Sequence, residues 1–222
     1  MKLKELESLM QEVSPFLQPK VELEQYPTGA HLASRLLYTV ANSYGEFEGK
    51  VVADLGCGTG MLAIGAAALG AGQVLAFDLD QDALETAQEN VRGIFGDSDD
   101  EADDDGAAQI EFVRSDVRLL AEQQPRLHVD TVIMNPPFGT RQKGVDMDFL
   151  RAAAGIAGTS VYSLHKTSTR DFIQKFAVKT LGLAPGAATV VAQLRYDLPP
   201  TYAFHRLKSK DIEVDLWRFQ MS

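Results

Sequence analysis

Several residue types and patterns that define other classes of protein are scarce in this chain. Its 222 residues include one cysteine, which excludes an internal disulfide and any zinc or redox site built on paired cysteines. The longest apolar run, Met61–Gly72, is too short and too rich in small residues to cross a bilayer. The N-terminus, MKLKELESLM, carries acidic residues where a secretory signal needs an apolar stretch. We therefore expect an intracellular protein without a membrane span.

Basic residues are in the minority and are unevenly distributed. The chain holds 21 lysines and arginines against 31 acidic residues, a net charge of −10 that has the wrong sign for a simple nucleic-acid-binding protein. Residues 1–140 have 9 basic and 24 acidic side chains, whereas residues 141–222 have 12 and 7. Seven acidic residues lie within Asp97–Asp105. Because residues 96–106 show no apolar periodicity, we interpret them as a flexible, solvated insertion, which leaves a basic C-terminal third.

The order of the apolar segments predicts a single α/β domain over residues 1–222. An N-terminal helical segment, residues 1–45, contains a helix at Lys2–Met10 and a second helix that follows Thr28, a plausible cap. Strands are predicted at Val51–Leu55, Val74–Phe77, Ile110–Val113, Val129–Met134, Ser160–Leu164, Ala188–Leu194 and Ile212–Phe219, and further helices at Met61–Leu69, Asp82–Gly93, Asp146–Ala157 and Ser168–Leu181. The last two strands have no helix between them and should pair antiparallel. The prediction is a doubly wound, mainly parallel, seven-stranded Rossmann-like sheet with a C-terminal antiparallel hairpin.

A glycine-rich loop after the first strand predicts a nucleotide site. Gly56, Gly58 and Gly60 allow a sharp turn and the close approach of a ligand, and Asp78 lies where a carboxylate binds ribose hydroxyls. Both NAD and S-adenosylmethionine fit this pattern. The cationic S-adenosylmethionine is favoured by a rim of acidic side chains at neighbouring strand ends, formed by Asp54, Asp78, Asp80 and Asp116. In a second interpretation, the carboxylate of Asp54 holds the loop through backbone N–H groups.

The segment Asn-Pro-Pro-Phe at Asn135–Phe138 closes an apolar strand and indicates amine methylation. The lone pair of the exocyclic amine of adenine is delocalised into the ring, and methylation requires that pair to be localised and aimed. The side-chain oxygen of Asn135 and a backbone carbonyl of Pro136 or Pro137 can accept the two N–H groups and draw the nitrogen toward tetrahedral geometry. Phe138 offers a face on which the base can stack. The competing interpretation is a plain strand-ending turn.

Aromatic and basic residues alternate in the connection between the last two predicted strands. This mixture supplies the stacking faces and phosphate partners that a single-stranded RNA segment needs. Together with two residues that follow the fifth strand, the candidate RNA contacts are His165, Lys166, Tyr196, Tyr202, Phe204, His205, Lys208 and Lys210. The competing interpretation is an ordinary hairpin loop with solvated lysines.

In combination, six motifs of this sequence resemble the methyltransferase-like protein 5 family. They are Glu24–Thr28 (EQYPT), Asp54–Gly60 (DLGCGTG), Asn135–Thr140 (NPPFGT), Tyr162–Lys166 (YSLHK), Arg195–Pro199 (RYDLP) and Asp211–Leu216 (DIEVDL). The resemblance covers nearly the whole chain except the acidic insertion. It implies a Rossmann-like class I methyltransferase that uses S-adenosyl-L-methionine to form N6-methyladenosine in 18S ribosomal RNA of the small subunit.

The resemblance also implies roles for individual residues. Cofactor contacts would come from the N-terminal segment, the glycine loop and the next two strand ends, namely Gln25, Thr28, Asp54, Gly56, Thr59, Met61, Asp78, Asp116 and Val117. Within this set, Asp78 would bind the ribose, and Asp116 with Val117 would lie near the adenine. The catalytic residues would be Asn135, Pro136, Pro137 and Phe138.

A partner and a location follow from the same resemblance. It implies a heterodimer with a small zinc-binding methyltransferase activator that stabilises the catalytic subunit. Ile110 and Phe112 alternate on one face of the third predicted strand, and an exposed apolar edge strand invites the addition of a partner strand. We therefore expect the activator at the edge near Ile110–Val113. The expected location is the nucleus (nucleolus) and the cytoplasm.

Two other functions remain open at this point. One is protein glutamine N5-methylation, because a flat carboxamide nitrogen poses the same lone-pair problem as the amine of adenine. The other is a non-catalytic scaffold that binds an adenosine ligand. The basic aromatic connection favours an RNA substrate over a protein glutamine, and the scaffold remains open.

Overall fold

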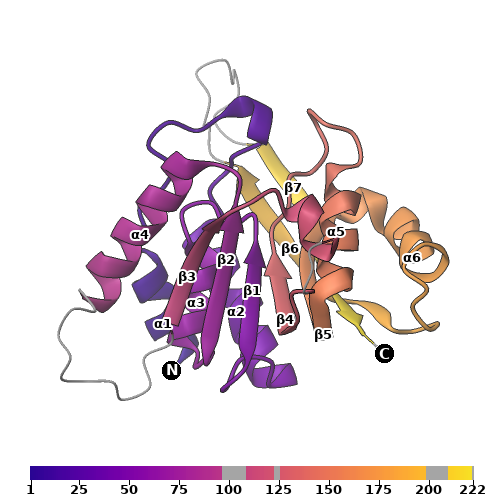
Figure 1. Cartoon of the computed structure of the whole chain (residues 1–222), viewed down its shortest axis with the longest axis horizontal. Coiled ribbons are helices and arrows are strands. Elements are labelled where there is room, and N and C mark those ends of the chain that lie inside the picture. The colour runs from indigo at the N-terminus through magenta and orange to yellow at the C-terminus, as the bar shows by residue number, and fades with distance from the viewer. Residues whose placement is uncertain (97–108, 123–125, 199–209, 222) are drawn as a thin grey trace.

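A computed structural model of the chain describes residues 1–96, 109–122, 126–198 and 210–221. It contains one seven-stranded sheet with helices on both faces (Figure 1). The strands are β1 (Val51–Leu55), β2 (Gln73–Asp78), β3 (Gln109–Arg114), β4 (Val129–Met134), β5 (Ala157–Lys166), β6 (Ala188–Leu198) and β7 (Lys210–Gln220). The helices are α1 (Leu3–Met10), α2 (Ala30–Tyr44), α3 (Met61–Ala68), α4 (Gln81–Phe95), α5 (Val145–Ile156) and α6 (Arg170–Lys179), and the short 3-10 helices are η1 (Val21–Leu23), η2 (Val117–Glu122) and η3 (Thr167–Thr169). Every predicted strand and helix is present, whereas the three 3-10 helices were not predicted.

The strand order is β3-β2-β1-β4-β5-β7-β6. β1 to β5 run parallel to one another, and β7 pairs antiparallel with both β5 and β6. The predicted doubly wound, mainly parallel sheet with a C-terminal antiparallel hairpin is confirmed. The order reverses between β1 and β4, which is the switch point where ligands of such sheets bind beyond the carboxyl ends of the strands.

The core consists of two clusters of buried side chains, one on each face of the sheet. Successive residues of β1 point to opposite faces of the sheet. Val52 therefore packs in one cluster, and Ala53 and Leu55 pack in the other. Helices α1, α2 and α3 cover the first face, and η2, α5 and α6 cover the second (Figure 1). The strands are therefore packed on both faces, and their carboxyl ends lie between the two layers.

The start of α2 differs from the prediction. Its N-cap is Gly29, which makes no side-chain capping bond, so Thr28 does not cap the helix. The Thr28 hydroxyl instead accepts a hydrogen bond from Asn135 at the end of β4. A contact between distant segments has therefore replaced the local capping role.

Two other predictions can be placed on this fold. Apart from Gly96, the acidic insertion at residues 96–106 lies outside the described residues. Within the described ranges, no helix has both the length and the apolar composition to cross a bilayer.

Candidate functional site

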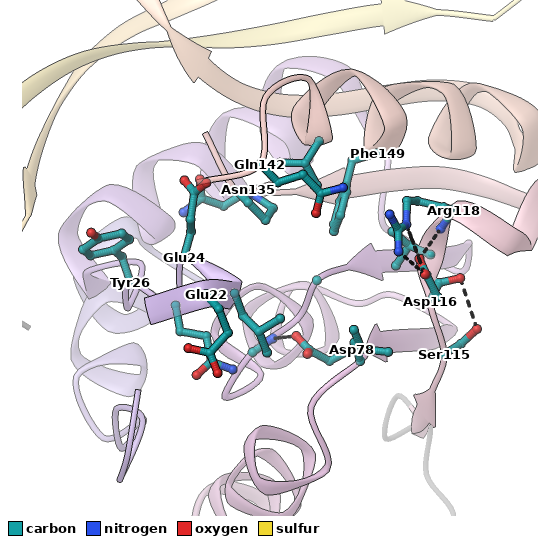
Figure 2. Close-up of a pocket in the computed structure, with 18 of the residues that line it drawn as sticks. Glu22, Glu24, Tyr26, Asp78, Ser115, Asp116, Arg118, Asn135, Gln142 and Phe149 are labelled. Carbon is teal, nitrogen blue, oxygen red and sulfur yellow. Dashed lines mark hydrogen bonds and ion pairs between the residues drawn. The ribbon is translucent and has the colours of Figure 1, made fainter. Parts of the chain in front are cut away.

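A pocket lies at the carboxyl ends of β1, β2, β3 and β4, beneath the segment that joins α1 to α2. We call that segment, residues 14–28, the N-terminal strap. Figure 2 shows strap residues Glu22, Glu24 and Tyr26 on one side of the pocket and Asp116 with Arg118 on the other. The lining residues are Phe16, Glu22, Leu23, Glu24, Gln25, Tyr26, Gly56, Gly58, Asp78, Leu79, Ser115, Asp116, Val117, Arg118, Asn135, Pro137, Gln142, Val145 and Phe149.

The glycine loop forms the floor of the pocket and is tightly enclosed. The backbone N–H groups of Gly56 and Cys57 donate to the carbonyl of Phe77 at 2.8 and 3.0 Å, which ties the loop to β2. Gly58 has a φ of +54°, and a Cβ there would lie 2.7 Å from Cζ of Phe16. A Cβ on Gly56 would lie 2.9 Å from Cε1 of Phe149. Only glycine therefore leaves room for the aromatic rings that flank the loop.

Asp78 is the last residue of β2, and its carboxylate faces the pocket beside the glycine loop (Figure 2). It accepts hydrogen bonds from the backbone N–H groups of Gly58 at 2.8 Å and Asp80 at 2.9 Å. Burial nevertheless raises the pKa of Asp78 above its ordinary value. Each carboxylate oxygen can accept more than one hydrogen bond, so Asp78 can also receive ribose hydroxyls.

Asp54 lies below the loop rather than at the pocket. It is 1% exposed, and Oδ2 accepts a hydrogen bond from the backbone N–H of Ala63 at 3.0 Å. Burial raises the pKa of Asp54 to about 8, so the carboxyl group is mostly protonated at neutral pH. The second interpretation, in which Asp54 bonds backbone N–H groups, agrees with this contact, although the N–H group belongs to the start of α3 rather than to the glycine loop.

The predicted acidic rim carries less charge than expected. Asp80 points away from the pocket to Lys20, with Nζ 2.5 Å from Oδ1, and although burial opposes ionisation, Lys20 and Gln25 hold the pKa of Asp80 below its ordinary value. Hydrogen bonds from Arg118 lower the pKa of Asp116, and the two form an ion pair at 2.5 Å. The argument for a cationic ligand from a rim of four carboxylates is therefore wrong in detail, because Asp54 and Asp80 do not line the pocket and Asp116 is paired with Arg118. Negative charge at the pocket comes from Asp78 and from residues that were not predicted, Glu22 and Glu24.

The N-terminal strap is fastened at several points. Near its start, the backbone N–H of Ser14 donates to Oδ1 of Asn90 at 2.9 Å. Farther along, Nε2 of Gln25 donates to Oδ2 of Asp80 at 2.7 Å, while Oε1 accepts from the backbone N–H of Lys20 at 2.7 Å. The bonds to Asn90 and Asp80 hold the strap over the pocket from the side of α4, whereas the bond between Gln25 and Lys20 lies within the strap.

The other side of the strap contacts the loop that follows β4. Glu24 is 9% exposed and has a φ of +51°, a left-handed conformation that is unfavourable for a residue with a Cβ. Its Oε1 accepts a hydrogen bond from the backbone N–H of Arg141 at 2.7 Å. The strained backbone thus aims a buried carboxylate at the loop that carries the Asn-Pro-Pro-Phe segment.

The Asn-Pro-Pro-Phe segment stands at the opposite end of the pocket from Asp78 (Figure 2). Nδ2 of Asn135 donates to Oγ1 of Thr28 at 2.9 Å, and Asn135 and Pro137 line the pocket. Pro136 is buried. The ammonium of Lys166 lies 5.7 Å from the ring centroid of Phe138, which places a cation beside the proposed stacking face.

Of the predicted RNA contacts, His165 is in the wrong place. It is 1% exposed, its Nε2 lies 2.9 Å from Oγ of Ser163, and its Nδ1 lies 3.7 Å from Oδ2 of Asp146. A buried imidazole cannot reach a phosphate, and His165 instead lies between β5 and α5, next to Ser163 and Asp146. Tyr196 and Lys210 lie on β6 and β7 but their side chains are outside the described set, as are Tyr202, Phe204, His205 and Lys208 altogether.

The structure therefore brings together part of the predicted site. The predicted residues that line the pocket are Gln25, Gly56, Asp78, Asp116, Val117, Asn135 and Pro137. Thr28 contacts Asn135, while Asp54, Thr59, Met61, Pro136 and Phe138 do not line the pocket. Residues that sequence reasoning missed include Phe16, Tyr26, Leu79 and Phe149. Leu79 and Tyr26 are direct neighbours of predicted residues, a usable signal, whereas nothing in the pattern around Phe16 or Phe149 distinguishes them from packing residues.

Comparisons with known proteins agree with this geometry. A family model described as ribosomal protein L11 methyltransferase (PrmA) matches residues 25–135. The rRNA N6-adenosine-methyltransferase METTL5 of Danio rerio is 48% identical, over 99% of this chain and 99% of that protein. The corresponding Mettl5 of Drosophila melanogaster is 45% identical, over 100% of this chain and 97% of its own.

A solved structure extends the likeness to three dimensions. The crystal structure of a proposed RNA methyltransferase from Pyrococcus horikoshii matches with a TM-score of 0.77 and 38% identity, over 100% of this chain and 98% of that chain. The L11 methyltransferase model stops at Asn135, whereas the two animal proteins match over almost the full length. The chain therefore belongs to the METTL5 family of rRNA N6-adenosine-methyltransferases.

Proposed function

We propose that this protein transfers a methyl group from S-adenosylmethionine to the exocyclic N6 of an adenosine in 18S ribosomal RNA. The observation that carries the proposal is the place of Asn135, at the end of a pocket whose other walls suit an adenosine cofactor. Membership of the METTL5 family supports adenosine as the target nucleoside and rRNA as the substrate. The choice of the 18S molecule rests on the family resemblance of the motifs.

The pocket residues fit S-adenosylmethionine. Asp78 offers a carboxylate to ribose hydroxyls, and Val117 and Phe149 offer apolar surface to an adenine ring. A Cβ on Gly56 or Gly58 would fill the floor of the pocket, so the loop is built for close approach by a ligand. Glu22 and Asp78 give the pocket a negative character that suits a sulfonium cation.

The Asn-Pro-Pro-Phe segment would then act on the base. S-adenosylmethionine supplies an electrophilic methyl group, so the task of the chain is to hold N6 with its lone pair aimed at that methyl. Oδ1 of Asn135 and a carbonyl of Pro136 or Pro137 accept the two N–H groups of the amine out of the base plane. Phe138 provides the stacking face, worth about 1–3 kcal/mol for one base.

A direct test is mass spectrometry of ribosomal RNA nucleosides after unmodified small subunits are incubated with the protein, its activator and the cofactor. We expect one new N6-methyladenosine in 18S RNA. The Asn135→Ala variant should lose transfer while its cofactor affinity, measured by calorimetry, stays nearly intact. A variant rate within about tenfold of wild type, equal to about 1.4 kcal/mol, would show that Asn135 lacks the proposed role.

A protein substrate is the second candidate, and the match to the L11 methyltransferase model favours it. That match spans residues 25–135, so it covers only part of the pocket lining and stops one residue after β4. Parallel incubation of the enzyme with intact subunits and with isolated ribosomal proteins and release factors separates the two functions. If the labelled methyl groups appear in protein rather than in RNA, the substrate is a protein and the proposed adenosine methylation is wrong.

For the partner, we propose a small zinc-binding activator at the outer edge of β3. β3 is an edge strand of the sheet, Ile110 and Phe112 are half-buried, and Val113 is 36% exposed. These features suit β-strand addition by a partner. Co-expression with the activator should turn a poorly soluble protein into a one-to-one complex in size-exclusion chromatography. A protein that stays monomeric and stable alone at micromolar concentration would exclude an obligate heterodimer.

An rRNA substrate leads us to propose a location in the nucleolus and the cytoplasm. Imaging of a fluorescent fusion would test this, and exclusive accumulation in another compartment would contradict it.

A further inference from the structure

Thr28 makes a contact that joins two distant parts of the site. It is the last residue of the strap, and its Oγ1 accepts a 2.9 Å hydrogen bond from Nδ2 of Asn135, 107 residues farther along the chain. Thr28 is not among the residues that line the pocket. Its hydroxyl therefore faces the carboxamide of Asn135 rather than the cofactor space.

The orientation of this carboxamide matters for the chemistry. A carboxamide has a donor end and an acceptor end, and rotation by half a turn exchanges them at almost no change in shape. The exocyclic amine of adenine presents two N–H donors, so only the oxygen end of Asn135 can receive it. The bond to Thr28 engages the nitrogen end and also fixes the plane of the group.

The strap is fastened just before Thr28, which makes the contact a firm one. Three residues earlier, Gln25 is buried and bonded to Asp80 at 2.7 Å. Four residues earlier, the carboxylate of Glu24 receives the backbone N–H of Arg141, in the loop that follows Asn135. The strained backbone of Glu24 persists because these contacts hold it. Thr28 is thus held next to Asn135 by a segment that is anchored on both sides of the pocket.

We propose that Thr28 is a positioning residue whose hydroxyl holds the carboxamide of Asn135 in the orientation that accepts the target amine. Because the strap both covers the pocket and orients Asn135, the orientation of the Asn135 carboxamide depends on the strap being in place over the pocket. This role differs from the direct cofactor contact implied by the family resemblance. It deepens the proposed adenosine methylation and rests on it.

The test compares Thr28→Val, which keeps the shape but removes the hydroxyl, with Thr28→Ser, which keeps the hydroxyl. Single-turnover transfer to RNA is measured with saturating cofactor and substrate, and cofactor affinity is measured by calorimetry. For Thr28→Val we expect a rate lower by about 10- to 100-fold and a cofactor dissociation constant within about twofold of wild type. Thr28→Ser should recover the rate to within about threefold. Thr39→Val is the matched control, because the Thr39 hydroxyl donates a hydrogen bond to the carbonyl of Arg35 within its own helix, α2.

Three results would overturn the inference. The first is a parallel loss of rate and cofactor affinity in Thr28→Val, which would indicate a cofactor contact. The second is an equal loss in Thr28→Ser, which would indicate packing rather than the hydroxyl. The third is a further loss of the same size when Thr28→Val is added to Asn135→Ala, because a residue that acts through Asn135 has nothing left to position. Failure of the proposed function is distinct, since the wild-type protein would then give no methylated RNA.

Discussion

Asp54 illustrates how a buried carboxyl group can serve the loop rather than the ligand. Its side chain is enclosed beneath the glycine loop, where it receives the backbone N–H of Ala63 at the start of α3. Burial raises its pKa to about 8, far above the value expected in an unfolded chain. Between about pH 4 and pH 8, the folded state keeps a proton that the unfolded state has already released. The contribution of Asp54 to the free energy of unfolding therefore decreases as the pH rises over this range, and it is lost once the pH passes the folded pKa.

The Asp54→Asn variant should reveal this linkage. Asparagine keeps an oxygen for Ala63 but cannot ionise, so the variant should lose less stability than wild type as the pH rises from about 6 to 9. Thermal unfolding across that range, without ligand, measures the difference in Tm between the two proteins. A constant difference would show that Asp54 does not titrate there. Asp130→Asn, at a half-buried position, provides a control for the loss of a carboxylate.

Phe138 offers a second prediction at the level of one side chain. Removing its ring in Phe138→Ala should lower kcat/KM for RNA by about 10- to 100-fold, because stacking of one base contributes about 1–3 kcal/mol. Phe138→Trp should retain most of the activity. Phe172→Ala removes an aromatic ring that is 58% exposed on α6 and serves as the control. If kcat/KM for Phe138→Ala equals that of the control, Phe138 does not have the proposed stacking role.

At the level of elements, the N-terminal strap closes the pocket without belonging to the sheet or to a long helix. It depends on side-chain bonds to α4, chiefly from Gln25 and Lys20 to Asp80. A buried hydrogen bond to a charged group contributes about 1.5–3 kcal/mol. The closed position of the strap is therefore set by a few polar contacts and is open to adjustment by mutation.

Gln25→Ala should loosen the strap and weaken cofactor binding. The change removes both bonds of the carboxamide, so we expect the cofactor dissociation constant to rise by about tenfold, or about 1.4 kcal/mol. Gln18→Ala alters an exposed glutamine of the same strap and should have no effect. Titration calorimetry gives both values. Equal affinities in the two variants would mean that the strap does not contribute to the cofactor site.

The sequence was most informative for elements with strong local patterns. The predicted bounds of β1 and β4 agree with the structure because each is an apolar run with turn residues at its end. The contacts that fasten the strap to the rest of the chain could not be seen in the sequence, because they join residues 55 to 117 positions apart, such as Gln25 with Asp80 and Glu24 with Arg141. The burial of His165 and the displacement of Thr28 from its capping role also depend on tertiary neighbours. The motifs predicted which residues carry the proposed chemistry, whereas the contacts that hold the strap over the pocket could be seen only in the folded structure.

For the whole molecule, charge is divided between two regions. Residues 1–140 have an excess of acidic side chains, and residues 141–222 have an excess of basic ones. The acidic region includes Asp78 and the glutamates of the strap at the pocket. The basic region includes Lys166 beside Phe138. This division suits a cationic cofactor in the pocket and a polyanion over the C-terminal part.

The two ligands should therefore respond differently to salt. Raising the salt concentration from about 50 to 200 mM should weaken RNA binding about tenfold or more if three or more phosphates are contacted, because bound counterions are released. Cofactor affinity should change by less than about twofold, since a buried contact is screened far less. Fluorescence anisotropy and calorimetry give the two series. RNA affinity that is insensitive to salt would contradict phosphate recognition by the basic region.

The position of β7 has a consequence for biosynthesis. β7 follows β6 in the chain but lies between β5 and β6, and its Trp217 and Phe219 fill the core. Until residues 210–220 have been translated, β5 lacks its neighbour on that side and β6 has nothing to pair with among the described strands. A polypeptide terminated early on the ribosome would keep an open strand edge and an uncovered core, which favour aggregation and proteolysis. Prematurely stopped translation products would thus be degraded rather than persist as partly active enzyme.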